Sequence, residues 1–300
     1  MLLKYLINMD RKTKIIATVG PSLSSESKIK KIIDAGANVL RINFSHGTLE
    51  DHENVISWAR KSNKQVAIMQ DIQGPKIRTG IASENTFLEK SKNVTLTNIE
   101  TESNTDIVFI NYENLLRDVN VDDRVFIDDG QIVLKVVEKE NDKLEALILI
   151  GGELRDNQGV AFPDSNLSVS AITEKDKEHL KFGSEHDVDF VAVSFVRNAS
   201  DINLVKEIIP KDVKVIAKIE LKTALENIDE ILDVADGVMV ARGDLGVQLP
   251  LEQVPFVQKQ ILDAANKRGK ISITATEMLQ SMKTSYRPTR AEVTDITNAI

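Results

Sequence analysis

The sequence contains no cysteine among its 300 residues. Disulfide bridges, thiolate-bound zinc and cysteine nucleophiles are therefore excluded. A chain without disulfides is suited to a reducing compartment, and for this reason we expect a cytoplasmic location.

Two further features are missing: an excess of basic residues and long apolar runs. The net charge of −8 argues against a general nucleic-acid-binding protein. An anionic ligand would need a local group of cations that acts against the overall negative field. No apolar run approaches the length of a membrane span. The apolar run within the N-terminal stretch 1–14 is too short for a signal peptide. We therefore expect neither nucleic acid nor a membrane among the partners.

Three common site motifs are also absent. The sequence has no Walker loop, no G-x-G-x-x-G and no H-E-x-x-H. Its four histidines are scattered, and only His46 lies near the end of a predicted strand. Any reactive site must therefore be assembled from side chains on separate segments.

What the sequence does contain is a repeated strand–helix pattern. Continuously apolar, β-branched runs predict seven strands, at 14–20, 38–45, 65–72, 189–196, 214–220, 237–244 and 271–278. Parallel strands buried on both faces have this character. Amphipathic helical patterns lie between them, over 24–37, 173–187 and 252–269 among others. The pattern predicts an α/β fold, and the number of strands favours a (β/α)8 TIM barrel over an open sheet, although periodicity alone does not separate the two.

Residues 79–163 break this rhythm. Short alternating runs separated by turns predict antiparallel strands, and Asp129-Gly130 is a hairpin signal. We predict a small all-β domain inserted at 79–163 after the third barrel strand, above the barrel mouth. The barrel domain would then comprise 1–78 and 164–300, with a last helix beginning near Thr289.

Polar side chains collect where the apolar runs end. In (β/α)8 barrels the reactive groups lie at the C-terminal ends of the strands. Six successive strands end in polar residues: Arg41, Asn43 and Ser45; Asp71; Ser194 and Arg197; Lys218 and Glu220; Arg242 and Asp244; Thr274 and Thr276. One such ending would mean little, but six in succession predict a site.

The segment AKIE (217–220) is the most informative of these endings. Residues two apart in a strand face the same side, so Lys218 and Glu220 point together. Neighbouring parallel strands lie about 4.8 Å apart, so Glu220 and Asp244 can share one hard cation, which suits Mg²⁺. Lys218 could then stabilise charge on a transferring phosphoryl group or an enolate. A structural salt bridge remains the alternative explanation of the Lys218–Glu220 spacing.

Several segments resemble the signature segments of pyruvate kinase, in the same order. They read RINFSHG (41–47), QDIQGPKIRTG (70–80), AKIE, MVARGDLGV (239–247) and ITATEMLQSM…RPTRAEV (273–293). The resemblance implies a barrel with an inserted β-domain lid. It also implies a glycolytic phosphotransferase that moves the phosphoryl group of phosphoenolpyruvate to ADP, giving pyruvate and ATP, with Mg²⁺ as cofactor.

The resemblance assigns roles to individual residues. Lys218 would be the catalytic transition-state stabiliser, and Glu220 and Asp244 would bind Mg²⁺. The implied substrate-binding residues are Arg41, Lys218, Gly243 (through its N–H), Asp244 and Thr276. The implied nucleotide-binding residues are Asn43, His46 and Arg78. The implied monovalent-cation site comprises Asn43, Ser45, Asp71 and the carbonyl of Ile72.

Four positions depart from the usual family pattern. Gln73 and Lys76 stand where many members have lysine and glutamate, and a lysine at position 76 resembles the K⁺-independent members. A tethered ammonium near Asp71 could replace the monovalent ion, so we expect K⁺ to be dispensable. Gln158 stands where the family has a nucleotide-contacting lysine, and Glu277 stands where glutamine is usual.

Two other functions compete with this prediction. A Mg²⁺-dependent carbon–carbon lyase or aldolase on a phosphoenolpyruvate/pyruvate-type barrel would use a similar carboxylate pair, but it needs no nucleotide lid. A catalytically incomplete form is the other, since the family continues past Ile300 into an eighth strand and a C-terminal domain. Full-length members are usually tetramers, so we expect a homo-oligomer. Because two buried-type strand edges would be exposed, we expect residues 1–300 alone to be poorly stable, aggregated or inactive.

Overall fold

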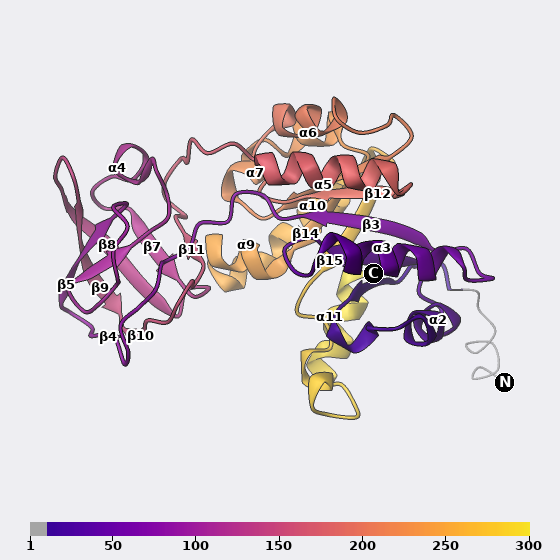
Figure 1. Ribbon diagram of the computed structural model, residues 1–300, viewed down its shortest axis with the longest axis horizontal. Coiled ribbons are helices and arrows are strands. Elements are labelled where there is room, and N and C mark those ends of the chain that lie inside the picture. Colours follow the sequence, from indigo (N-terminus) through magenta and orange to yellow (C-terminus); the bar gives the residue numbers. More distant parts are fainter. Residues whose placement is uncertain (1–10) are drawn as a thin grey trace.

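The computed structural model describes residues 11–300, and these form two bodies joined by two chain segments (Figure 1). The N-terminal stretch considered above for a signal peptide falls largely in residues 1–10, outside the described part.

The larger body is built on a sheet of seven parallel strands. These are β1 (Ile16–Val19), β2 (Val39–Asn43), β3 (Ala67–Ile72), β12 (Phe190–Val193), β13 (Lys214–Ile219), β14 (Gly237–Ala241) and β15 (Ile271–Ala275). Each is hydrogen-bonded to the next in the order β1-β2-β3-β12-β13-β14-β15. An open doubly wound sheet would reverse its order at a switch point, whereas a (β/α)8 barrel keeps the sequence order. The predicted α/β fold of barrel type, and all seven predicted strands, are confirmed.

Helices connect and cover these strands. They are α2 (Glu26–Asp34), α3 (Leu49–Arg60), α5 (Glu174–Glu185), α6 (Ala199–Lys206), α7 (Lys222–Glu226), α8 (Ile228–Val234), α9 (Arg242–Gln248), α10 (Val254–Lys267) and α11 (Arg290–Ala299), with 3-10 turns η1 (Pro21–Leu23), η2 (Leu251–Gln253) and η3 (Gln280–Lys283). Thr289 caps α11 as predicted. The strand predicted over 237–244 was too long, because α9 begins at Arg242. Within residues 11–300, none of the helices has the length and apolar content that crossing a bilayer requires.

Side chains alternate between the two faces of each strand, and those that point inward fill the barrel interior. Its core consists of one or two apolar residues from each strand, namely Ile16, Val39, Met69, Phe190, Ala192, Ile216, Met239, Ile273 and Ala275. Residues two positions apart share a face. The inward positions that follow this layer are Thr18, Arg41, Asp71, Ser194 and Lys218. The same period that buries the apolar layer therefore places polar groups inside the barrel at the C-terminal ends of the strands.

The smaller body is the inserted domain. Its strands are β4 (Phe87–Leu88), β5 (Asn93–Thr97), β6 (Ile107–Phe109), β7 (Arg124–Ile127), β8 (Ile132–Lys139), β9 (Leu144–Ile150), β10 (Gly152–Glu153) and β11 (Val160–Ala161). They form a six-stranded sheet and a two-stranded sheet around a separate hydrophobic core. The β7–β8 hairpin turns through Asp128, Asp129 and Gly130, all at positive φ. Two details differ from the prediction: β5 and β6 pair in parallel, and the short helix α4 (Leu115–Asp118) interrupts the all-β pattern.

The two segments that join the bodies meet at one buried carboxylate. Asp176, 1% exposed, accepts the backbone N–H of Gly74 at 3.2 Å on the outgoing segment. Its other oxygen accepts the N–H and hydroxyl of Thr173 at 2.9 and 2.6 Å on the returning segment, completing the cap of α5. Gly74 has φ of 67°, a conformation that favours glycine. Asp176 thus fixes both ends of the insertion beside each other.

Replacing this carboxylate tests its role. We expect Asp176→Ala to lower the free energy of unfolding by about 2–4 kcal/mol, because it removes a helix cap and leaves a buried N–H unpaired. Asp51→Ala is the matched control, since Asp51 completes the same capping box on α3 but is exposed and, in the described part of the chain, has no hydrogen bond to a distant segment. Denaturant unfolding of both variants measures the difference. Equal losses would show that the Gly74 contact contributes nothing.

Candidate active site

Lys218 is the centre of the polar group inside the barrel mouth. Its ammonium donates to Glu220 Oε1 at 2.8 Å, to Ser194 Oγ at 2.8 Å and to Asp71 Oδ1 at 3.2 Å. Lys218 is 8% exposed, and both carboxylates are 1% exposed. Strands β3, β12 and β13 supply these groups, which the sequence predicted as strand endings.

Arg41 on β2 extends the network. Its Nε donates to Asp71 Oδ2 at 2.6 Å, and its Nη1 donates to Thr18 Oγ1 at 3.0 Å. Asp71 therefore bridges two cations, Arg41 and Lys218, and holds them on the same side of the barrel mouth. Ser194 completes the arrangement by donating its hydroxyl to the carbonyl of Ile72 at 2.7 Å. Two fixed cations close together suit an anionic phosphoryl group.

Burial and charge determine the ionisation of the central pair. Burial acts to lower the pKa of Lys218, but Glu220 and Asp71 outweigh it and raise that pKa above its usual value. Lys218 is therefore held as a charged ammonium. Burial raises the pKa of Glu220, and the negative charge of Asp244 raises it further against the opposing effect of Lys218.

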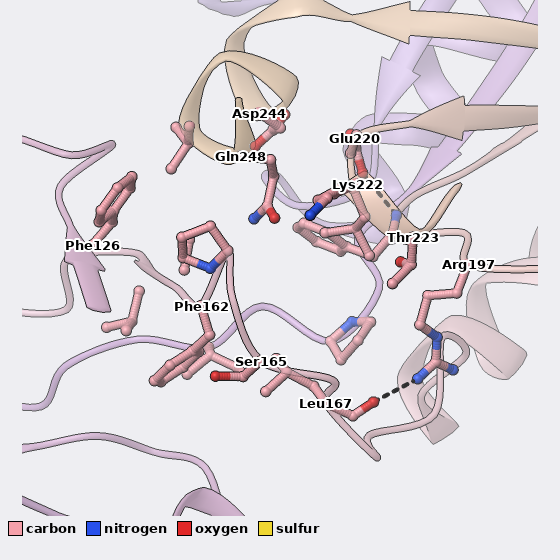
Figure 2. Close-up of a pocket in the computed structure, with 18 of the residues that line it drawn as sticks. Phe126, Phe162, Ser165, Leu167, Arg197, Glu220, Lys222, Thr223, Asp244 and Gln248 are labelled. Atoms are coloured by element: carbon pink, nitrogen blue, oxygen red, sulfur yellow. Dashed lines mark hydrogen bonds between the residues drawn. The ribbon is translucent and has the colours of Figure 1, made fainter. Parts of the chain in front are cut away.

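Glu220 and Asp244 form a pair of carboxylates with room beside them. Both line a cavity of about 330 Å³ between the barrel and the inserted domain, and Figure 2 shows them on the same side of it. Glu220 is positioned by the backbone N–H of Phe195, which donates to its Oε2 at 2.7 Å. Asp244 lies exposed in the first turn of α9.

This carboxylate pair fits a hard divalent cation. The negative charge of Asp244 disfavours ionisation of Glu220, and a cation between the two carboxylates would relieve that repulsion. Within residues 11–300, no three His, Asp or Glu side chains gather as a closed metal cage. A pair of carboxylates that leaves positions for water and substrate oxygens is the arrangement that Mg²⁺ favours.

Gly243 and Thr276 also come together. The Gly243 N–H donates to Thr276 Oγ1 at 2.9 Å, and Arg242 donates to the carbonyl of Thr276 at 2.7 Å. Arg242 is in turn paired with Asp295 on α11 at 2.6 Å. The Gly243 N–H predicted to face a substrate carboxylate is thus engaged by the hydroxyl of Thr276.

The predicted nucleotide and monovalent-cation residues divide between the two bodies. Asn43 Oδ1 accepts the N–H of Ser45 at 3.1 Å, and His46 is exposed on the same loop after β2. Arg78 is the last residue before the inserted domain and contacts it, because its Nη1 donates to the carbonyl of Asn157 at 2.7 Å. Among the hydrogen bonds of the described residues, none joins Arg78 to Asn43 or His46.

The two unusual positions have distinct surroundings. Lys76 is exposed in the cavity wall beside Gly159, and in the described part of the chain both ion pairs of Asp71 go to Arg41 and Lys218 instead. Gln158 is buried, and its Oε1 accepts the N–H of Arg155 at 2.9 Å. The structure therefore does not pair Lys76 with Asp71, and Gln158 is hydrogen-bonded within the inserted domain.

Sequence reasoning missed three contributors. Thr18 carried a usable signal, because it lies near the end of the first strand, two residues after an interior apolar position. Asp295 lies in a helix far along the chain from Arg242, and nothing in the sequence links the two. The N–H of Phe195 is a backbone group, so its role depends on the positive φ of 54° at that residue.

Comparison with known proteins decides the family. A family model described as the pyruvate kinase barrel domain matches residues 10–300. This chain belongs to the pyruvate kinase family. It is 46% identical over 298 residues to a protein named pyruvate kinase from Thermotoga maritima, covering 97% of this chain and 64% of the relative. It is 45% identical over 300 residues to one from Staphylococcus aureus strain MRSA252, covering 97% of this chain and 51% of the relative.

The chain thus spans between half and two thirds of the length of these pyruvate kinase relatives. The family resemblance of the motifs at the strand ends is confirmed, and so is the barrel expected from it.

The metal pair can be tested by direct binding of Mn²⁺ as a spectroscopic probe for Mg²⁺. We expect Glu220→Gln and Asp244→Asn each to weaken Mn²⁺ binding by roughly tenfold or more, because each removes one of two anionic ligands. Asp164→Asn is the control, since Asp164 lines the same cavity but is paired with Arg124. Electron paramagnetic resonance titration measures free Mn²⁺. A loss in Asp164→Asn equal to that in Asp244→Asn would contradict the assignment.

Proposed function

We propose that this chain carries the site for transfer of the phosphoryl group of phosphoenolpyruvate to ADP, which gives pyruvate and ATP in glycolysis. The observation that carries the proposal is the buried ammonium of Lys218, held beside Glu220 and bridged through Asp71 to Arg41. Membership in the pyruvate kinase family supports the same reaction.

The residues have complementary tasks in this reaction. Phosphoryl transfer needs charge neutralisation and in-line positioning more than covalent chemistry. Arg41 would hold the phosphoryl group, and the positive charge of Lys218 would stabilise the negative charge that develops during transfer. Glu220 and Asp244 would hold Mg²⁺, which when bound supplies positive charge against the phosphate and enolate oxygens.

The inserted domain would act as the lid of this site. Phe126 and Phe162 from that domain line the cavity that Glu220 and Asp244 also line (Figure 2). Apolar side chains over a phosphoryl group exclude the water that would hydrolyse it. We assign 79–163 to the lid, and 1–78 with 164–300 to the barrel.

Other parts of the proposal follow from the family. ADP would bind near Asn43 and His46, with Arg78 approaching from the junction with the lid, and Gly243 and Thr276 would contact the substrate. A homo-tetramer and a cytoplasmic location are expected of the full-length protein, with no nucleic acid or membrane as partner.

Pyruvate formation tests the proposal against its two competitors. A lactate dehydrogenase-coupled assay should show pyruvate only when phosphoenolpyruvate, ADP and Mg²⁺ are all present. A carbon–carbon lyase would not need ADP, and an incomplete form would produce no pyruvate above the background rate.

Lys218 is the residue whose loss should affect turnover most selectively. We expect Lys218→Met to raise the activation barrier by roughly 3–4 kcal/mol or more, because the charge on the transition state loses its ammonium. Lys222→Met is the matched control, since Lys222 is an exposed lysine lining the same cavity. Turnover is measured together with Mn²⁺ affinity and melting temperature, which report whether the site remains folded. Near-native turnover in Lys218→Met would remove this residue from the mechanism.

Lys76 is proposed to make K⁺ dispensable. Its ammonium lies in the cavity wall, where it adds a tethered positive charge to the region that receives phosphate. We expect activity to persist in K⁺-free tetramethylammonium buffer, and Lys76→Glu to become partly K⁺-dependent. Lys222→Glu makes the same charge change elsewhere in the cavity and should not confer K⁺ dependence. A fall beyond about tenfold, or 1.4 kcal/mol in barrier, on removing K⁺ from the unaltered protein would contradict the proposal.

A further inference from the structure

Residues 167–169, here called the strap, lie on the segment that returns from the inserted domain to the barrel. The inserted domain binds the strap from one side. Asp118 accepts the backbone N–H and the hydroxyl of Ser168 at 2.7 and 2.6 Å. Leu167 and Val169 are partly buried against the hydrophobic core of the inserted domain. The strap is therefore attached to that domain by hydrogen bonds and by packing.

The barrel binds the same three residues from the other side through Arg197. Its Nη1 donates to the carbonyl of Leu167 at 3.0 Å, drawn as a dashed line in Figure 2, and to the carbonyl of Val169 at 2.7 Å. Asp201 orients the guanidinium, accepting from Nη2 at 3.2 Å and from Nε at 3.3 Å. One planar guanidinium thus joins a barrel carboxylate to two strap carbonyls.

Arg197 is also close in sequence to the group that positions Glu220. Two residues earlier, the N–H of Phe195 donates to Glu220 Oε2 at 2.7 Å from a backbone at φ of 54°. Asn227 donates to the carbonyl of Arg197 at 2.9 Å and restricts the turn from a third side. The turn over 195–197 therefore contacts the carboxylate at one end and the strap at the other.

We propose that Arg197 is a positioning residue that couples the placement of the strap to the orientation of Glu220. Displacing the strap would pull on the guanidinium, and through the short turn it would shift the Phe195 N–H that holds the carboxylate. The metal-binding consequence rests on the proposed function, because it takes Glu220 as a metal ligand. The structural coupling from the strap to Phe195 does not.

Arg197→Met and Arg197→Lys test the coupling. Methionine keeps the apolar stem and removes every donor, whereas lysine keeps the charge but lacks the planar fork. Arg60→Met is the matched control, because Arg60 also donates to two backbone carbonyls and to an aspartate, Asp189, at the N-terminal ends of β3 and β12. The Arg60→Met substitution therefore removes a similar set of contacts at the opposite end of the barrel.

Hydrogen exchange and Mn²⁺ binding are the two measurements, made on the intact protein. In Arg197→Met we expect amide exchange over 165–171 and at Phe195 to rise by roughly tenfold or more. We expect Mn²⁺ affinity to fall by about threefold to tenfold, since the support of a ligating carboxylate is loosened. Arg60→Met should change neither quantity.

The outcomes separate the proposals. Faster exchange in the strap with unchanged exchange at Phe195 would show that Arg197 holds the strap alone, and the coupling would be wrong. If Arg197→Met does not fold, Arg197→Lys decides by the same criteria. If the unaltered protein binds no Mn²⁺, the proposed metal site fails, and the exchange at Phe195 alone then decides the coupling.

Discussion

The buried pairing of Lys218 with Glu220 and Asp71 is the constraint on which the site depends. Removing ions from water costs several kcal/mol each, so buried charges persist only when they are paired and hydrogen-bonded. Lys218 and Arg41 together balance Asp71 and Glu220. Within residues 11–300, no ion pair includes Asp244, which lines the cavity together with Glu220, so a divalent cation could bind beside them. On the proposed function, the same electrostatics would suit the barrel mouth to a metal ion and a phosphoryl group.

The same pairing explains why the inserted domain matters to a site built on barrel strands. Fixed charges act most strongly where water is excluded, because the local dielectric constant is then low. The inserted domain supplies one wall of the cavity, and its two connections to the barrel are fixed at Asp176. The position of that wall is thus set in part by the hydrogen bonds of Asp176, which lie outside the cavity. The barrel strands thus hold the charged residues of the site, and a few polar contacts attach the inserted domain beside them.

The parallel strands of the barrel, and most of the polar residues at their ends, could be predicted from the sequence. Continuous apolar runs determine parallel buried strands, and the two-residue period determines which strand-end residues point inward, so Arg41, Asp71, Lys218 and Glu220 were found together. Other features carry no such signal. The sequence pattern of RGDLGV (242–247) is compatible with either a strand or a helix. The start of α9 at Arg242 was therefore missed. The orientation of a long side chain depends on its neighbours in space, so the sequence placed Lys76 near Asp71, whereas its side chain lies beside Gly159 in the cavity wall.

The central claim is that the carboxylate pair and the two cations converge on a single phosphorylated ligand. Paramagnetic relaxation of the ³¹P resonance of phosphoenolpyruvate by bound Mn²⁺ tests it most directly, because the effect falls off steeply with the distance between metal and phosphorus. The account predicts strong relaxation in the unaltered protein and its loss in Asp244→Asn. Phosphoenolpyruvate that binds to the Mn²⁺-loaded protein without enhanced phosphorus relaxation would place ligand and metal at separate sites and contradict the account.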